Sequence, residues 1–384
     1  MTDQSFRHSD HLRADFSQNL SAMYRSEVPA YGKLIDIVGH INAQYEGLRS
    51  DGERHGAIRL GTPAELSLIR RVFAVLGLHP VGYYDLSVAG LPVHSTAFRP
   101  ITKQAFDISP FRMFTSLLRL DLLPNTLRKT AESALAARKI LSPLGHELLK
   151  KAEAQGGLNA KDGSSFIREA VNIFAWHKRA HVDFQTYQAL LSEHPLIADI
   201  VSFQGPHMNH LTPRVADIDA AHAMMKADGM EIKETIEGPP RRQVPILLRQ
   251  TAFKALTEAV EFKTEKGWET AHHTARFGEI EQRGAALTPK GRALYDHCLA
   301  ENNFLEFPDT REALRTEGLA YFDNSGAPLT YEDFLPVSAA GIFKSNLREA
   351  KNIETQTATG NQAAFEMALG CPVLDMFELY DKEL

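Results

Sequence analysis

The spacing of hydrophobic and polar positions divides the chain into helical and β-rich stretches. Residues 9–48 repeat apolar side chains at spacings of three and four, which predicts amphipathic helix. Shorter apolar runs near residues 54–107, and again over 201–283, predict strands. The stretch between them has helical spacing almost throughout, including the run FRMFTSLLRLDLL. We therefore expect a β-rich core that carries a helical insertion and has helical ends.

One supersecondary pattern occurs twice in the β-rich stretches. Each copy begins with His-x-x-x-Arg at the head of a predicted strand: His55 with Arg59, and His210 with Arg214. A predicted helix, a glycine turn and a second strand follow: residues 63–76, Gly77 and PVGYYDL in the first copy, and residues 219–227, Gly229 and MEIKETI in the second. A repeated unit that brings a histidine each time indicates a paired-module fold with a metal between the halves.

These patterns predict an α+β protein in five segments. They are an N-terminal helical segment (1–53), a first βαβ module (54–107), a helical insertion (108–200), a second module carrying metal ligands (201–289) and a C-terminal helical and loop segment (290–384).

Composition narrows the class of protein. The 384 residues include 42 basic and 48 acidic side chains, and no basic stripe with interleaved aromatics is present, so we expect no nucleic-acid partner. No apolar run approaches the ~20 residues of a membrane helix, so we expect that a membrane is not a partner of the protein. Two cysteines, Cys298 and Cys371, cannot form a disulfide framework and suit a reducing compartment. With a polar amino terminus, this predicts a cytoplasmic protein.

The first His-x-x-x-Arg copy predicts a binding site. Residues two apart in a strand share a face, so His55, Ala57 and Arg59 point the same way. The Cα atoms of His55 and Arg59 would lie ~13 Å apart. This spacing suits a metal ligand at one end of a small anionic substrate and a carboxylate clamp at the other, because the arginine fork meets a carboxylate through two parallel hydrogen bonds.

A third metal ligand is expected in the run TARFGEIEQRG. In a regular strand Phe277, Glu279, Glu281 and Arg283 share one face. Buried carboxylates are costly unless they are paired or bind a cation. Two histidines and one carboxylate form the facial triad of non-haem Fe(II) oxygenases. Glu279 and Glu281 share this face, so the alternation of side chains does not identify which of the two binds the metal.

Several segments together resemble a known family. The run FGEIEQRG resembles the strand that carries the last iron ligand in 4-hydroxyphenylpyruvate dioxygenase and its vicinal oxygen chelate relatives. In that strand the ligand is the glutamate before the isoleucine. Further segments resemble the 2-oxoadipate dioxygenase/decarboxylase family, from about residue 50 to 350: HGAIRLGT, NHLTPRVADID, LLRQTAFKAL, RGAALTPKGRALYD and DFLPVSAAGIF.

The resemblance implies a fold and a site. The fold would be a vicinal-oxygen-chelate-like core of two βαβββ modules with a helical insertion and helical flanks. Fe(II) would be held by His55, His210 and Glu279, with Glu281 as the alternative ligand or as a supporting acceptor. Both histidines would border the substrate, Arg59 would bind it as a catalytic residue, and the loop around Val337 would lie against it.

The resemblance also implies a reaction. It is the oxidative decarboxylation, by O₂, of a 2-oxo dicarboxylic acid: 2-oxoadipate would give 2-hydroxyglutarate and CO₂, a step of lysine breakdown. Two alternatives remain. One is a glyoxalase-type metal-dependent lyase or isomerase on the same fold, and the other is a metal-free protein that binds a small molecule. Oxygen consumption separates the first alternative from the dioxygenase, and insensitivity to chelators would favour the second. The oligomeric state is not indicated.

Other histidines carry weaker indications. His177 and His181 have helical i,i+4 spacing, but Lys178 and Arg179 between them favour a solvated helix face. His207 precedes the predicted strand of His210, so we expect it in a loop or in support of a ligand. His94 is a weaker metal candidate than His55.

Overall fold

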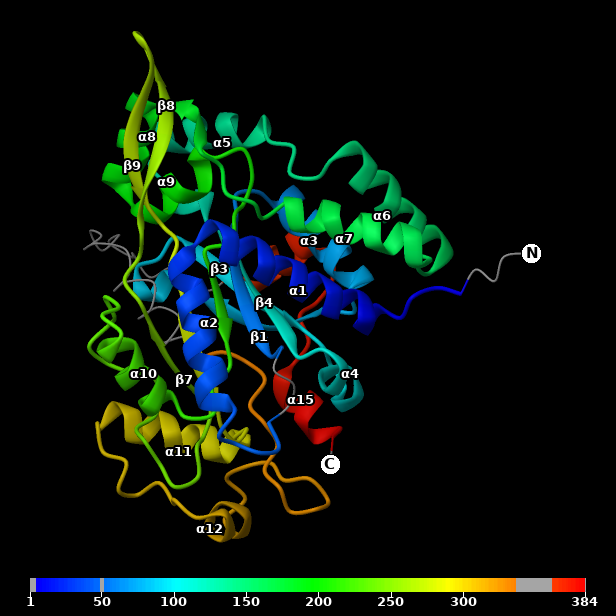
Figure 1. Ribbon diagram of the computed structural model, residues 1–384, viewed down its shortest axis with the longest axis vertical. Coiled ribbons are helices and arrows are strands. Elements are labelled where there is room, and N and C mark those ends of the chain that lie inside the picture. The colour runs from blue at the N-terminus through cyan, green and yellow to red at the C-terminus, as the bar shows by residue number, and fades with distance from the viewer. Residues whose placement is uncertain (1–4, 49–51, 336–360, 384) are drawn as a thin grey trace.

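A five-stranded sheet forms the centre of the computed structural model, which describes residues 5–48, 52–335 and 361–383 (Figure 1). Its strand order is β2-β3-β4-β1-β6. β1 pairs parallel with β4 and antiparallel with β6, and the other pairs are antiparallel. The strands are β1 (Arg54–Leu60), β2 (His79–Asp85), β3 (Val93–Arg99), β4 (Phe111–Leu118) and β6 (His210–Pro213).

A second, two-stranded sheet continues the first beyond β6. It consists of β7 (Leu248–Ala252) and β10 (Glu279–Arg283), which run antiparallel. A bridge between Arg214 and Glu281 joins it to the end of β6, where the Val215 amide donates to the Glu281 carbonyl at 2.8 Å. Strands β1, β6 and β10, which are distant in sequence, therefore lie side by side.

Helices cover both faces of this core. They are α1 (Ser9–Glu27), α2 (Pro29–Asn42), α3 (Pro63–Val75), α4 (Lys103–Ile108), α5 (Asn125–Ala136), α6 (Pro143–Gln155), α7 (Ala160–Asn172), α8 (Phe184–Glu193), α9 (Pro195–Ser202), α10 (Ile218–Ala227), α11 (Pro289–Ala300), α12 (Arg311–Thr316), α14 (Gln362–Leu369) and α15 (Met376–Asp381). None of the helices in the described ranges is long and apolar enough to cross a membrane.

Two hydrophobic clusters lie on opposite faces of the central sheet. On one face, Phe16 of α1 packs edge-to-face against Phe73 of α3 and Phe111 of β4, with ring centroids 6.3 and 5.8 Å apart. Full burial of each such ring contributes roughly 1.5–3 kcal/mol. Ile58 of β1 belongs to this cluster, whereas Ala57 belongs to the cluster on the opposite face. The predicted alternation of side chains along β1 is thus confirmed.

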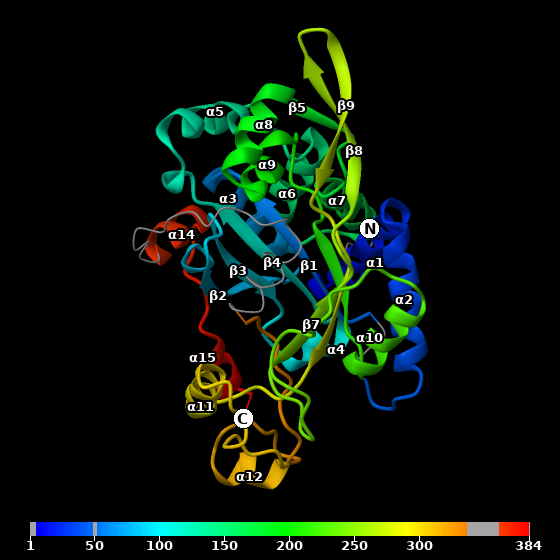
Figure 2. The same cartoon turned by 90° about the vertical axis from the view of Figure 1, so that its left-hand side faces the viewer.

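A separate three-stranded sheet contains a long hairpin. β8 (Thr257–Thr264) and β9 (Gly267–Thr274) form the hairpin, and β5 (Arg179–Asp183) pairs parallel with β8. The tip of the hairpin projects from one end of the molecule (Figures 1 and 2). In the sequence the hairpin lies between β7 and β10, so it interrupts the second module.

The structure confirms much of the predicted secondary structure. Two helices, α1 and α2, occupy most of residues 9–48 and meet at Pro29. The predicted helices at 63–76 and 219–227 are α3 and α10, and PVGYYDL lies in β2. The α+β class is therefore confirmed.

The helix predicted for FRMFTSLLRLDLL is wrong, because Phe111–Leu118 forms β4 and a 3-10 turn at Leu120–Leu122 follows. β4 lies between β3 and β1, and every one of its residues is buried. A strand buried on both faces loses the alternation that identifies strands in a sequence. The predicted boundary at residue 107 therefore cuts off the last strand of the first module, which is β1-α3-β2-β3-β4.

The strand predicted for MEIKETI is also wrong as a continuous element. The segment makes one isolated bridge to the β7 side, Ile232 with Phe253, and the residue that follows it makes another, Glu237 with Gln250. The register shifts by two residues between these bridges, which interrupts the ladder. The helical insertion likewise contains strand β5, and this strand holds His181, so the predicted helical pair with His177 does not form.

Candidate metal centre

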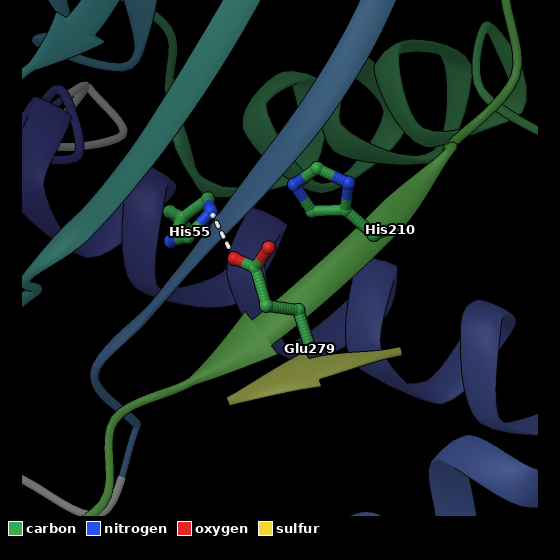
Figure 3. Close-up of side chains that lie close together, drawn as sticks. All are labelled: His55, His210 and Glu279. Atoms are coloured by element: carbon green, nitrogen blue, oxygen red, sulfur yellow. Dashed lines mark ion pairs between the residues drawn. The ribbon is translucent and has the colours of Figure 1, made fainter. Parts of the chain in front are cut away.

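Three neighbouring strands bring the three predicted ligands together. His55 lies on β1, His210 begins β6 and Glu279 begins β10. One ligand atom from each residue lies within 4.8 Å of the other two. All three side chains are buried and point toward one another (Figure 3). They form a potential metal site, as the two His-x-x-x-Arg copies and the GEIEQRG run predicted.

The pairing of the strands explains this meeting. On β6, His210 lies opposite Ala57 and Thr212 lies opposite His55. The Thr212 hydroxyl donates to Glu279 Oε1 at 3.0 Å, and Gln250 Nε2 on β7 donates to the same oxygen at 2.7 Å. The other oxygen, Oε2, is buried and has no hydrogen-bond partner among the described residues. An oxygen left without a partner beside two imidazoles is suited to bind a cation.

Glu281 supports His55 and is not part of the cluster. Its Oε2 lies 2.9 Å from His55 Nδ1. Arg283 donates to both of its oxygens, from Nε at 2.8 Å and from Nη2 at 2.9 Å. Burial raises the pKa of Glu281, but Arg283 and His55 outweigh burial and hold it below its usual range. Both carboxylate oxygens are thus engaged, and Glu279 is the glutamate of the candidate site.

The two imidazoles differ in their surroundings and in the direction of their pKa shifts. Nδ1 of His55 donates to the ionised Glu281, and Nε2 lies 3.3 Å from Oε1 of Glu279, so Nε2 is the ring nitrogen directed to the cluster. Burial lowers the pKa of His55, but Glu281 and Glu279 outweigh burial and raise it. Burial, with His55 and Arg59 nearby, holds the pKa of His210 well below its ordinary value. His210 is therefore neutral, the form in which imidazole binds a metal.

The donor set fits a non-haem iron site. Two imidazole nitrogens and one carboxylate oxygen leave open positions on an octahedral ion. The surroundings are otherwise apolar: Phe334 packs on His55 with ring centroids 4.9 Å apart, and Phe277 packs on His210 at 4.6 Å.

Arg59 is buried close to this cluster and is held by a residue of the helical insertion. Its Nη1 donates to Asp199 Oδ2 of α9 at 2.6 Å. Asp199 also accepts from His273 Nε2 at 2.9 Å and from Asn209 Nδ2 at 3.2 Å. His207 lies in the loop before β6, one of the two positions expected for it, and its Nε2 is 3.1 Å from the same carboxylate. The role of Arg59 as a substrate clamp stays a prediction.

Two supporting residues were missed by sequence reasoning. Asp199 interrupts the apolar run PLIADIV. A charged residue at this position is the one local indication in the sequence that the carboxylate is buried and has partners. Gln250 likewise stands within an apolar run, PILLRQTAF. Its neighbour Arg249 turns away and pairs with Asp219 at 2.7 and 3.1 Å.

Of two other candidates, the structure describes one. Val337 lies outside the described residues. His94 on β3 lies apart from the three-residue cluster, and its Nδ1 is 3.2 Å from the Tyr83 hydroxyl.

Known proteins share this fold and sequence. Residues 16–346 match the family model of the 2-oxoadipate dioxygenase/decarboxylases. The 2-oxoadipate dioxygenase/decarboxylase of Pseudomonas putida is 48% identical, over 99% of this chain and 96% of the relative. That of Escherichia coli K12 is 48% identical, over 97% of this chain and 96% of the relative.

Solved structures agree with these relatives. A crystal structure of the hydroxyglutarate synthase of Pseudomonas putida in complex with 2-oxoadipate has a TM-score of 0.90 and 47% identity, covering 98% of this chain and 96% of that one. A putative glyoxalase superfamily protein from Ralstonia eutropha has a TM-score of 0.59 at 20% identity, covering 73% of this chain and 86% of that one. This second likeness concerns the fold alone, and it confirms the predicted vicinal-oxygen-chelate-like core. The chain belongs to the 2-oxoadipate dioxygenase/decarboxylase family.

Proposed function

We propose that the protein is an Fe(II)-dependent dioxygenase that oxidatively decarboxylates a 2-oxo dicarboxylic acid. The observation that carries the proposal is the buried cluster of His55, His210 and Glu279 in a chain of this family. 2-Oxoadipate is the substrate best supported, because a relative with 47% identity has been crystallised with it. The products would be 2-hydroxyglutarate and CO₂.

The reaction balances without a further reductant. The carboxyl group next to the oxo group leaves as CO₂. One oxygen atom of O₂ enters the new carboxylate at the former oxo carbon, and the other enters the hydroxyl group of the product. The substrate therefore supplies all the electrons that reduce O₂.

Each residue of the site has a part in this reaction. Bound Fe(II) would supply the redox chemistry that activates O₂ beside the 2-oxo acid. His55 and His210 would each present an imidazole nitrogen to the ion, and Glu279 would present the oxygen that its two hydrogen-bond donors leave open. Arg59 binds a substrate carboxylate and offsets its charge. The aromatic ring of Phe334 keeps water from the same space.

Oxygen uptake tests the proposal. Protein loaded anaerobically with Fe(II) should consume O₂ when given 2-oxoadipate, with one CO₂ released for each O₂ consumed. The His210→Ala protein should lose both. If no 2-oxo diacid supports uptake, the fold stands and the function moves to non-oxidative metal chemistry of the glyoxalase type.

We also propose a cytoplasmic location. Cys298 and Cys371 are both free, and Cys298 is buried. Unpaired cysteines suit a reducing compartment. Fractionation of the host cell would test this proposal, and recovery of the protein outside the cytoplasm would contradict it.

A further inference from the structure

Residues 331–334 form an irregular segment beside the metal site, since they belong to no helix or strand. Phe334 is 3% exposed, and its ring packs on His55 with ring centroids 4.9 Å apart. The same ring packs on Phe114 of β4, with ring centroids 5.1 Å apart. A segment of this kind has no strand ladder to satisfy its backbone groups and fix its position, so side chains must do both.

Phe334 also borders a surface cleft. The cleft has a volume of about 320 Å³ and lies between β2 and the C-terminal stretch that contains α15. Its lining includes Tyr84 of β2, Leu374 and Met376, together with Phe334. Phe334 therefore lies between this cleft and His55, and a displacement of its ring would admit water to the metal site.

Two tyrosine hydroxyls hold the backbone of the segment. The Glu332 amide donates to the Tyr380 hydroxyl at 2.7 Å, and the Phe334 amide donates to the Tyr84 hydroxyl at 3.3 Å. The Tyr380 hydroxyl in turn donates to Asp333 Oδ2 at 2.7 Å. Tyr84 belongs to β2 and Tyr380 to α15, so two elements that are far apart in the sequence meet at this segment.

Packing alone does not require these hydroxyls, because phenylalanine would fill the same space. Both tyrosines are buried, and a buried hydroxyl loses its hydration unless it finds a hydrogen-bond partner. Burial, with Asp333 nearby, raises the pKa of Tyr84, and the same causes raise the pKa of Tyr380 well above its ordinary value. Both hydroxyls therefore keep their protons at neutral pH and serve as hydrogen-bonding groups.

Arg283 connects the segment to the site. Its Nη1 donates to the Asp333 carbonyl at 3.0 Å, and its guanidinium also donates to both carboxylate oxygens of Glu281. Glu281 in turn accepts from His55 Nδ1. The His55 imidazole is thus in contact with the segment in two ways, through the ring of Phe334 and through the chain of hydrogen bonds that ends at Arg283.

We propose that Tyr84 and Tyr380 are positioning residues, whose hydroxyls fix residues 331–334 so that the ring of Phe334 covers His55 and keeps the water of the cleft from the metal. This inference rests on the proposed function, in which the reaction needs a site from which water is excluded. The C-terminal helix α15 thus completes the site from outside the strands that carry the ligands. Loss of either hydroxyl lets the segment open more often, and the separation between the cleft and the metal is then lost.

Hydrogen exchange of the metal-free protein tests the positioning directly. In Tyr380→Phe the amides of Glu332 and Phe334 should exchange about 2- to 10-fold faster, the factor by which loss of a hydrogen bond changes a local opening equilibrium. The Phe334 amide is bonded to Tyr84, so its faster exchange would show that the segment moves as a unit. Faster exchange at Glu332 alone would overturn the proposal.

The source of the hydroxyl oxygen in the product supplies a second readout. In the proposed reaction this oxygen comes from O₂, and water that reaches the metal can replace it by exchange. In water labelled with a heavy oxygen isotope, Tyr84→Phe and Tyr380→Phe should both raise the labelled fraction of 2-hydroxyglutarate by a similar factor. This fraction does not depend on how much of the protein is folded, so a merely structural role would leave it unchanged. An unchanged fraction in both variants would overturn the exclusion of water.

Tyr31→Phe is the matched control. Tyr31 of α2 is also buried, and its hydroxyl lies 3.2 Å from that of Ser21 of α1. This variant should change neither the exchange of residues 331–334 nor the labelled fraction, and equal changes in it would overturn the proposal. If Tyr380→Phe does not fold, Tyr84→Phe tests the same segment from β2. Absence of oxygen uptake by the natural chain with 2-oxoadipate would contradict the proposed function, and hydrogen exchange of the metal-free proteins would still decide the role of the two tyrosines.

Discussion

The two glutamates of β10 should respond differently to the same isosteric change. Glu279→Gln removes the carboxylate whose Oε2 has no hydrogen-bond partner among the described residues, whereas Glu281→Gln replaces the anionic acceptor of the His55 Nδ1 proton with a neutral amide. We expect Glu279→Gln to abolish tight binding of Fe(II), because a neutral amide replaces the one anionic ligand. We expect Glu281→Gln to weaken metal binding about 10- to 100-fold, the usual effect of removing the partner of a metal-bound histidine.

Stability should change in the opposite order. Glu281 accepts two hydrogen bonds from the buried Arg283, so its neutralisation leaves a buried guanidinium without its counter-charge. Breaking such a pair costs about 3–5 kcal/mol. Glu279 is held by the neutral donors Thr212 and Gln250, so Glu279→Gln should be tolerated far better.

Anaerobic titration calorimetry with Fe(II) and thermal denaturation of the metal-free proteins measure these two quantities separately. The natural chain is the reference for both. Tight metal binding by Glu279→Gln, together with complete loss in a folded Glu281→Gln protein, would show that Glu281 is the ligand and would refute the assignment from the hydrogen bonds.

Further predictions concern the clamp, acid stability and two glycines. Arg59→Ala should lower kcat/KM for 2-oxoadipate about 10- to 100-fold, and full turnover would remove the clamp assignment. Burial lowers the pKa of both His94 and His194 to about 4, so the unfolded chain takes up protons first as the pH falls. Each should therefore withdraw up to about 3 kcal/mol of stability between pH 6.5 and pH 4, a loss that urea unfolding across this range would detect and that His94→Gln should reduce. Gly291→Ala would place a methyl group 1.8 Å from the Leu319 carbonyl oxygen, so we expect a lower melting temperature, corresponding to about 1–3 kcal/mol or more. Gly39→Ala, in exposed helix with no atom within 4 Å, should raise stability by about 0.5–1 kcal/mol, and a lower melting temperature would contradict this.

The local features of the site could be predicted from the sequence. Strand parity depends only on residues two apart, so the sequence is sufficient to assign His55, Ala57 and Arg59 to one face. The repeat of His-x-x-x-Arg then indicated His210 as the second ligand, and the GEIEQRG run limited the third to two glutamates. The helices α1, α3 and α10 were equally predictable, because one apolar face of each is buried and the other is solvated.

The remaining features depended on how distant strands pair. β4 is buried on both faces, so its sequence lacks the alternation of a strand and resembles a helix. Glu279 and Glu281 share a face, and only the approach of His55, Thr212 and Arg283 gives them different partners. The sequence alone determined which residue types the site could use. Tertiary structure decided the partner of each, since the register between β1, β6, β10 and β7 is set by packing across the whole core.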